Sequence, residues 1–294
     1  NRVTATGVKV VRTSVTTMVD HPVLSSFLVA FGVRFVVIVV TGLFHDGVVI
    51  PDEGQYLTLA LVASEGRLDA SFWAGYGISL FESTRTFMWP LTALFWIFGP
   101  SRLIGQLLVV IFGAATASLS AGLAGRFWRP HIALGTGLLV AVFPSQVLWS
   151  SVVLREAHIW AGLAAIALVV DWSRRRNSTS RILVSTLSLG LLYIFVLRLR
   201  DQTAFLALWC LIPAFLFGCK KMPVRLPCAI FLLVFVPWIV GQGPGGFDFA
   251  QSALNRLGSS RGYMSLGADS AFTDTSMGLN NAYYASADGS GSGS

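Results

Sequence analysis

The first 242 residues alternate between long apolar runs and short polar segments. These runs approach the roughly 20 residues that an α-helix needs to cross a bilayer, and they are too continuous for the alternating strands of a membrane barrel. Irregular backbone is too costly in lipid to span it. The pattern therefore predicts an all-α polytopic membrane protein. We place seven spans at about 24–44, 103–124, 131–150, 156–172, 181–197, 203–219 and 225–242.

One further apolar stretch, residues 86–99, is short for a span. It contains Pro90 and is followed by Pro100. A helix of this length reaches only about 21 Å at 1.5 Å per residue, which is less than the hydrocarbon core of a bilayer. We therefore predict an in-plane or re-entrant helix here, within a first outer loop of about 45–102 that carries interfacial helices.

The distribution of charge supports seven spans, because cytoplasmic loops are expected to hold the excess of Lys and Arg. With the N-terminus inside, the inner side collects twelve of the 21 basic residues against only Asp20 and Asp171. If 86–99 spanned, the run Arg174-Arg175-Arg176 would face outward. The twelve are Arg2, Lys9, Arg12, Arg126, Arg129, Arg174, Arg175, Arg176, Arg181, Lys220, Lys221 and Arg225.

The amino-acid composition agrees with a membrane protein and limits the expected binding partners. The chain is 54% hydrophobic and 12% charged, whereas soluble domains carry roughly 25% charged residues. Its net charge of +7 is explained by basic anchors facing anionic head groups, so we expect membrane lipids and no nucleic acid as partners. The three cysteines have neither disulfide nor metal-ligand spacing and are expected to be packing thiols.

The chain divides into three parts. Residues 1–242 form the predicted membrane module, residues 243–288 an outer (extracytoplasmic) tail or loop, and residues 289–294 a Gly/Ser linker-like end. No cleavable signal peptide is expected, because a polar segment of about 20 residues precedes a full-length apolar run.

The charged residues nearest the span ends cluster on the outer side, after the first, third and fifth spans. Charges near membrane depth are costly and usually face a cavity or each other. Three such loops with both signs of charge predict a site for an anionic, lipid-borne substrate; the alternative is polar loops paired only for topology. The residues are Asp52, Glu53, Arg155, Glu156, Arg198, Arg200 and Asp201.

Roles follow from the chemistry of these groups. Asp52, with Glu53 as the second candidate, is suited to take a proton from an attacking hydroxyl; a helix cap is the alternative, because a helix is expected to begin near Gln55. Arg198 and Arg200 would point about 200° apart on a helix, so one is expected to clamp a leaving phosphate. Interfacial snorkelling is the alternative for both.

Three further features leave alternatives open. Glu156 would lie in the first turn of a helix, where its carboxylate either interacts with the dipole or holds a metal or an acceptor sugar. Arg34, inside the first span, is expected to face the bundle and pair with a carboxylate or with carbonyl groups. The stretch from Tyr56 to about Leu68 is amphipathic and is expected to lie in the membrane interface beside the carboxylates.

The pattern Pro51-Asp52-Glu53-x-x-Tyr56 after the first span resembles the first outer loop of the GT-C glycosyltransferases. The similarity is greatest to the bacterial branch related to protein O-mannosyltransferases and lipid A aminoarabinose transferases. The stretch Trp149-Ser150-Ser151-Val152-Val153-Leu154-Arg155-Glu156 is similar to the third outer motif of bacterial members. Together the resemblance covers about residues 24–242.

The resemblance implies a module of seven membrane helices in the bacterial plasma membrane, with the active site facing the extracytoplasmic side. Such enzymes transfer a sugar from a polyprenyl-phosphate carrier to an acceptor hydroxyl, usually with inversion. Asp52 would be the base, with Glu53 as its neighbour in the catalytic motif. Tyr56, Arg155, Glu156, Arg198, Arg200 and Asp201 form the candidate substrate-binding set. Some members use a divalent cation and others do not, so the cofactor stays open.

Two other functions fit the same residues. A transporter or flippase for a lipid-linked anionic substrate would use the outer arginines for binding and would need no base. A non-catalytic membrane subunit would bind partners through the tail. For the glycosyltransferase, the expected partners are a lipid-linked sugar donor and an acceptor that is a glycan, a lipid or a protein.

Overall fold

The computed structural model describes residues 17–44, 50–66, 81, 84–175, 178–217 and 221–239; this part of the chain is helical and contains no strand. The all-α class is therefore confirmed for it. The helices are α2 (Pro22–Phe44), α3 (Pro51–Ser64), α5 (Arg85–Phe98), α6 (Arg102–Ala124), α7 (Pro130–Val142), α8 (Pro144–Trp149), α9 (Glu156–Arg175), α10 (Thr179–Leu199), α11 (Asp201–Leu216), α12 (Met222–Ile230), the π-helix η1 (Phe231–Phe235) and α13 (Val236–Ile239).

Four helices are long and apolar enough to cross a membrane: α2, α6, α10 and the continuous helix Met222–Ile239 formed by α12, η1 and α13. Helices α7 and α11 are apolar but shorter. Six of the seven ranges predicted as spans are each occupied by one continuous helical segment with ends within three residues of those predicted, and the seventh, 131–150, holds two helices, α7 and α8. The four long helices indicate an integral membrane protein.

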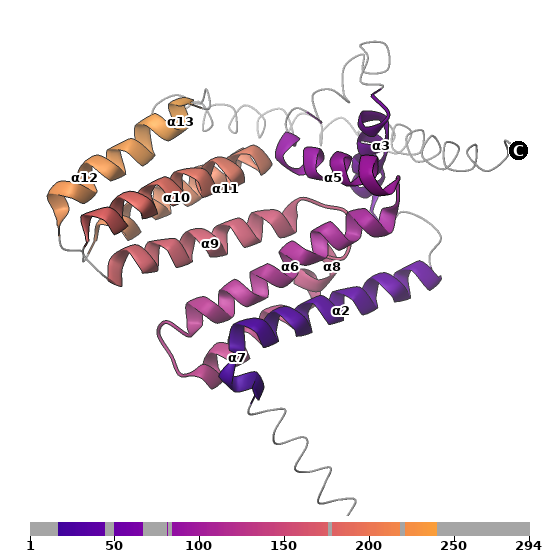
Figure 1. Cartoon of the computed structure of the whole chain (residues 1–294), viewed down its shortest axis with the longest axis horizontal. Helices are drawn as coiled ribbons and strands as arrows, with labels where there is room; N and C mark the ends of the chain where they lie inside the picture. The colour runs from indigo at the N-terminus through magenta and orange to yellow at the C-terminus, as the bar shows by residue number, and fades with distance from the viewer. Residues whose placement is uncertain are drawn as a thin grey trace, which may run out of the picture.

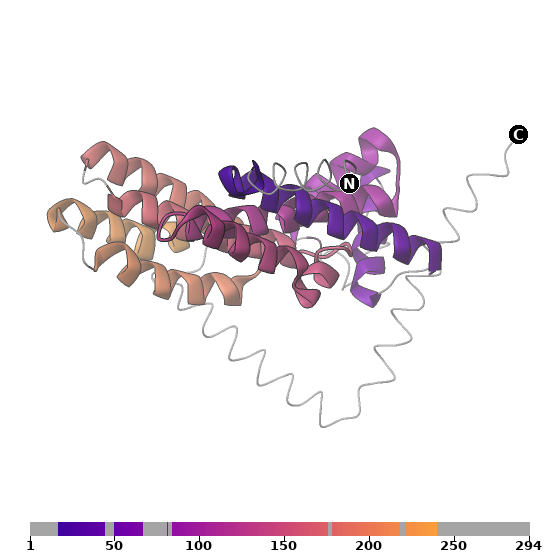
Figure 2. The same cartoon turned by 90° about the horizontal axis from the view of Figure 1, so that it is seen from below.

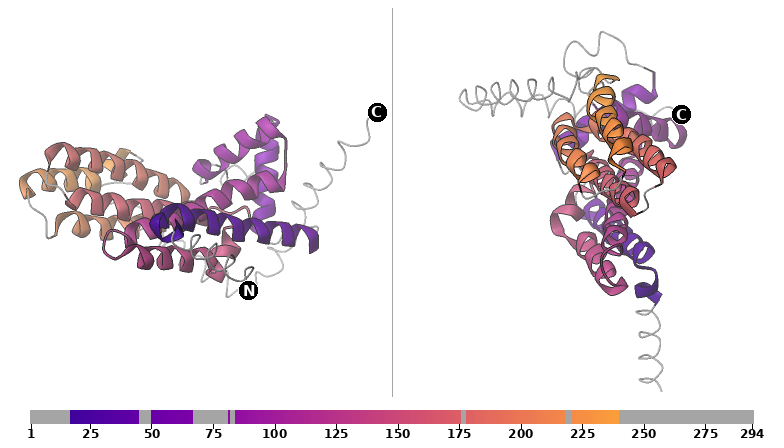
Figure 3. Two further views of the ribbon diagram at one scale, coloured as in Figure 1. Left: turned by 60° about the horizontal axis from the view of Figure 1, so that its bottom comes forward. Right: turned by 90° about the vertical axis from the view of Figure 1, so that its left-hand side faces the viewer.

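Helix α6 lies between α2 and α9 and also packs against α7 (Figure 1). Helix α9 packs in turn on α10, and α10 on α11 and α12. Seen from below, α10–α12 lie toward one end of the molecule and α2 lies away from them (Figure 2). Helices α3 and α5 pack on each other at the end where α6 begins (Figure 3). This end holds the charged residues that the sequence singles out.

The range 131–150, predicted as one span, is broken in two. Helix α7 ends at Val142, and α8 begins at Pro144. Phe143 between them has extended backbone angles, φ −62° and ψ 120°, because a residue that precedes proline is disfavoured in the helical region. Proline also lacks the N–H that would continue the helix. The break leaves carbonyl groups at the end of α7 without helical partners.

Arg34 supplies a donor to one of these carbonyls. Its guanidinium is fully buried and donates to the carbonyl oxygens of Ala30 and Ala141, at 3.0 and 3.1 Å, and to the hydroxyl of Ser150. The expectation that Arg34 faces the bundle and pairs with carbonyls is met by these contacts. Arg34 therefore holds α2 against the end of α7 and the residue that follows α8.

The segment after α8 is packed inside the helical bundle. Residues Ser150–Leu154 are buried and follow the side of α6. A Cβ built on Gly113 would lie 2.6 Å from the Cβ of Ser150, and one on Gly105 would lie 3.0 Å from Val153 Cγ2. The two glycines make room for irregular backbone, which is tolerated at membrane depth only where protein or a cavity encloses it. Of the stretch from Trp149 to Glu156, residues 150–154 are therefore enclosed by the bundle, whereas Trp149 is exposed.

Small residues also bring α2, α6 and α7 together, and this gives a testable contrast on α7. A Cβ on Gly137 would lie 2.6 Å from Ser26 Cβ and 2.8 Å from Ala121 Cβ, whereas one on Gly135 would meet nothing within 4 Å. We expect Gly137→Ala to destabilise the protein by about 1–3 kcal/mol through overpacking. Gly135→Ala is expected to be neutral or to stabilise by up to about 1 kcal/mol.

Unfolding of the two purified variants in detergent, followed by circular dichroism, measures this difference. Equal stability of the two alanine variants would contradict the close approach of α2 to α7.

Candidate functional site

Helix α3 positions the two acidic residues of the motif. Ile50 is extended and Pro51 occupies the first turn, where its missing N–H costs nothing. Asp52 and Glu53 follow in the same turn, and the partial positive charge of the helix N-terminus favours both carboxylates. The helix begins at Pro51, four residues before the start near Gln55 expected from the sequence, so both acids lie within it.

Most of helix α3 is enclosed by the protein on all sides. Every residue from Glu53 to Val62 is buried, and the helix ends at Ser64. The sequence predicts an amphipathic stretch from Tyr56 to about Leu68 that lies in the membrane interface. Residues 56–62 differ from this prediction, because α5 and the hydrophobic core cover them. Residues 67 and 68 lie outside the described residues.

Glu53 is bound from two sides. Arg102 Nε donates to Oε1 and Arg102 Nη2 to Oε2, each at 3.1 Å, and the backbone N–H of Val153 donates to Oε1 at 3.2 Å. The Glu53 side chain is completely buried, while that of Arg102 is 19% exposed. This bidentate pair joins α3 to the first turn of α6 and to the segment that precedes α9.

Asp52 differs from its neighbour in environment. Consecutive residues on a helix point about 100° apart, so Glu53 faces the protein and Asp52 is exposed. The anchoring of Glu53 fixes the backbone on which Asp52 stands. The arrangement therefore presents one accessible carboxylate on a rigid helical turn.

An aromatic chain runs from this turn into the core. Tyr56, four residues after Asp52, meets the ring of Phe87 edge-on at 5.2 Å. Phe87 meets His158 at 5.2 Å, and His158 stacks on Phe112 at 3.8 Å. Tyr56 is 5% exposed, so its ring acts mainly as packing between α3 and α5 here.

The residues after the third and fifth spans meet each other. Arg155 Nη1 donates to the carbonyl oxygen of Leu199 at 3.0 Å, which satisfies a carbonyl at the C-terminal end of α10. Glu156 in the first turn of α9 pairs with Arg200, with Oε1 and Nη1 3.8 Å apart. Its second oxygen, Oε2, is buried and has no hydrogen-bond partner among the described residues.

Arg198 and Asp201 stand on either side of this pair. Arg198 in the last turn of α10 is exposed and has no hydrogen-bond or ion-pair partner in the part of the chain that the structure describes. Leu199 between the two arginines is buried, so the two guanidinium groups leave the helix end in different directions. Asp201 is the first residue of α11 and accepts the N–H of Gln202 at 2.8 Å, which gives a partner to one of the free donors of the first helical turn.

Contacts link the three loops that carry the predicted site residues. Val153 joins Glu53 to the segment that ends in Arg155, and Arg155 joins this segment to Leu199. Sequence reasoning did not identify Arg102 as a partner of Glu53, nor Gln106, whose amide donates to the carbonyl oxygen of Ser151 at 3.0 Å. The sequence feature that could have identified them is the presence of one polar residue, Arg102 and then Gln106, in each of the first two turns of an otherwise apolar helix.

Side chains that commonly bind metal ions are scattered in the part of the chain that the structure describes. No group of three or more His, Cys, Asp or Glu side chains gathers in this part of the chain, and both oxygens of Glu53 face Arg102. A hard cation needs several oxygen ligands.

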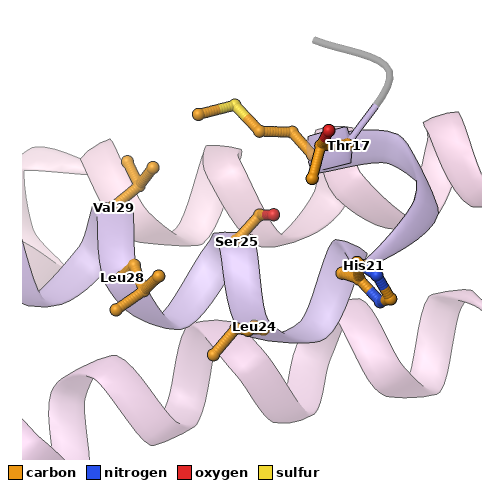
Figure 4. Close-up of a pocket in the computed structure, with 7 residues that line it drawn as sticks. Thr17, His21, Leu24, Ser25, Leu28 and Val29 are labelled. Carbon is orange, nitrogen blue, oxygen red and sulfur yellow. The ribbon is translucent and has the colours of Figure 1, made fainter. Parts of the chain in front are cut away.

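Pockets lined by described residues include two at the start of α2. One of about 390 Å³ lies along the first turns of α2 and is lined from Thr17 to Val29 by a single stretch of chain (Figure 4). That stretch is at the opposite end of α2 from the α3 connection, so this pocket is not part of the charged site.

Comparison with known proteins gives no match to a protein-family model, a curated protein or a solved structure.

Proposed function

We propose that this protein is an integral membrane glycosyltransferase of the GT-C type. It transfers a sugar from a polyprenyl-phosphate carrier to an acceptor hydroxyl. The main observation behind the proposal is that two adjacent carboxylates have different environments. Glu53 is buried against Arg102, while Asp52 is exposed on the same turn. The resemblance of Pro51-Asp52-Glu53 to the GT-C motif, and the four helices long enough to span a membrane, support the same function.

The proposed topology has seven spans. In it, α7 with α8, α9 and α11 cross the membrane together with the four longer helices, and α5 stays at one face. The excess of basic residues at the other end of the bundle supports a cytoplasmic location for that end. The charged site then opens to the extracytoplasmic side of a bacterial plasma membrane, where a carrier arrives laterally from the lipid.

In the proposed reaction, the Asp52 carboxylate accepts the proton of the acceptor hydroxyl. The hydroxyl oxygen forms a bond to the anomeric carbon, and the bond from that carbon to the phosphate oxygen breaks. The phosphate leaves with the electron pair, and a guanidinium stabilises its charge. Glu53 holds the turn in position through Arg102 and does not itself move a proton.

We assign the phosphate contact to Arg198. Its guanidinium is exposed and has no partner among the described residues, whereas Arg200 already faces Glu156 and Arg155 caps α10. Binding of phosphate to Arg198 therefore breaks no existing pair. A planar guanidinium suits bidentate binding of a phosphate.

Carrier binding by matched arginine variants tests this function. We expect Arg198→Gln to weaken binding of polyprenyl phosphate about 10- to 100-fold, the equivalent of roughly 1.5–3 kcal/mol for a charged hydrogen bond. Arg200→Gln is expected to change it by less than about threefold, because an exposed ion pair contributes little. Titration of the carrier into protein in nanodiscs measures both.

Two results would contradict the proposal. The proposed function would be ruled out if the wild-type protein neither bound polyprenyl phosphate nor transferred sugar from its sugar-loaded form. A loss on Arg200→Gln with none on Arg198→Gln would move the phosphate contact to the other arginine.

A further inference from the structure

We propose that the groove between α10 and α12 binds an anionic phospholipid at the basic end of the bundle. The groove has a volume of about 540 Å³ and its lining is predominantly apolar. Its lining residues are Leu183, Thr186, Leu187, Pro223, Val224, Pro227, Cys228 and Phe231. This site is separate from the charged site of the proposed enzyme and does not depend on it.

The lining follows one stripe along each helix. On α10, Thr186 and Leu187 lie three and four positions after Leu183, and from α12 into η1 the lining residues recur at the same spacing, so each set lies on one face. Both helices start at the basic end and run in the same direction. Thr186 is the polar residue of the α10 stripe, and its hydroxyl donates to the carbonyl oxygen of Ile182 at 2.8 Å. The groove is therefore apolar along its length and suits a hydrocarbon chain.

A cation stands at the mouth of the groove. Lys221 directly precedes α12, and its Nζ lies 3.3 Å from the hydroxyl of Thr179, one turn before Leu183 on the lining face of α10. The Lys221 backbone is left-handed, with φ 61° and ψ 44°, which is uncommon for a residue other than glycine. This conformation places an exposed ammonium group where the two stripes begin.

Neighbouring basic residues are engaged in other contacts. Arg225, on the buried side of α12, donates to the carbonyl oxygens of Ser173 and Phe215, at 2.6 and 3.1 Å. Arg181 lies over the ring of Trp172 at 4.9 Å. Lys221 is thus the exposed cation that the described residues place beside the groove.

The charge of Lys221 and the apolar lining of the groove indicate which lipid binds there. A phospholipid of the leaflet at the basic end places its head group level with the helix starts and its acyl chain along the stripe. A lysine near an anionic surface contributes attraction that a zwitterionic head group does not provide. The occupant is therefore an anionic diacyl phospholipid, with the phosphate near Lys221 and one acyl chain between Leu183 and Pro227.

Lipid titration of the purified protein in detergent, read by native mass spectrometry, tests the site. Phosphatidylglycerol is expected to bind about fivefold more tightly than phosphatidylcholine of the same acyl chains, the equivalent of ~1 kcal/mol for one lysine. Lys221→Gln is expected to remove this preference. Arg174→Gln, which removes one exposed positive charge at the same end but outside the groove, is expected to retain it.

A second pair of variants tests the groove itself. Leu183 lines it and Val184 does not, although their exposed fractions are nearly equal, 54% and 53%. Leu183→Trp is expected to fill the groove and reduce binding of both lipids, while Val184→Trp leaves binding unchanged; size-exclusion profiles check that each variant is folded.

Three results would overturn the proposal. They are equal affinity of the wild type for the two lipids, equal losses from Lys221→Gln and Arg174→Gln, and displacement of phosphatidylglycerol by a lower concentration of polyprenyl phosphate. The last would identify the groove as a carrier site.

Discussion

Replacement of Asp52 by Asn is expected to reduce sugar transfer by about 10²- to 10⁴-fold, the usual contribution of a general base. The amide keeps the size of the side chain but does not accept the proton of the acceptor hydroxyl. Because Asp52 is exposed, the substitution is expected to change the free energy of unfolding by less than about 0.5 kcal/mol. Transfer from a sugar-loaded polyprenyl phosphate by protein in nanodiscs measures the rate.

Carrier binding separates the enzyme from a transporter. Asp52→Asn is expected to leave the affinity for polyprenyl phosphate nearly unchanged, because the phosphate is assigned to Arg198. The matched control is Asp171→Asn, which removes a carboxylate paired with Arg175 at the opposite end of the bundle. Its transfer rate is expected to stay within about twofold of the wild type, because this pair lies away from the proposed site. Full transfer activity in Asp52→Asn would rule out the base, and substrate uptake that tolerates the same substitution would favour a transporter.

The positions of the helices were predictable because each long apolar run is bounded by a polar or proline-containing segment. Helices α2, α6 and α9 begin within two residues of the predicted positions. Two features were not predictable from hydrophobicity. The break at Phe143 depends on Pro144, and apolarity alone does not register it. The burial of Ser150–Leu154 depends on Gly105 and Gly113, whose missing side chains act on a segment distant in sequence.

The charged site was predictable in outline, since its acidic and basic residues follow alternate spans and such segments share one end of a bundle. The different environments of adjacent residues were not predictable from the sequence. Asp52 and Glu53 are both polar in the sequence, and only the turn of α3 shows which one faces Arg102. The same holds for Arg198 and Arg200, because the partner of Arg200 is Glu156 on another helix.

Loss of the Glu53 carboxylate is expected to destabilise the protein by on the order of 3 kcal/mol. Glu53→Ala leaves the Arg102 guanidinium and the Val153 N–H without their acceptor in a largely buried place, and breaking a buried pair typically costs 3–5 kcal/mol. The matched control is Arg200→Ala, which breaks an ion pair whose side chains are 45% and 25% exposed. That loss is expected to stay within about 1 kcal/mol. Unfolding of both variants in detergent measures the contrast.

A double-mutant cycle shows whether the pair itself is responsible. Glu53→Ala and Arg102→Ala are expected to be less than additive, with a coupling energy of roughly 1–3 kcal/mol, since each removes the partner of the other. The same variants are expected to lower sugar transfer through Asp52, because the turn that carries it loses its attachment to α6. Additive effects on stability, or normal transfer in a folded Glu53→Ala variant, would separate the buried pair from the exposed carboxylate and would require another explanation for how Asp52 is held.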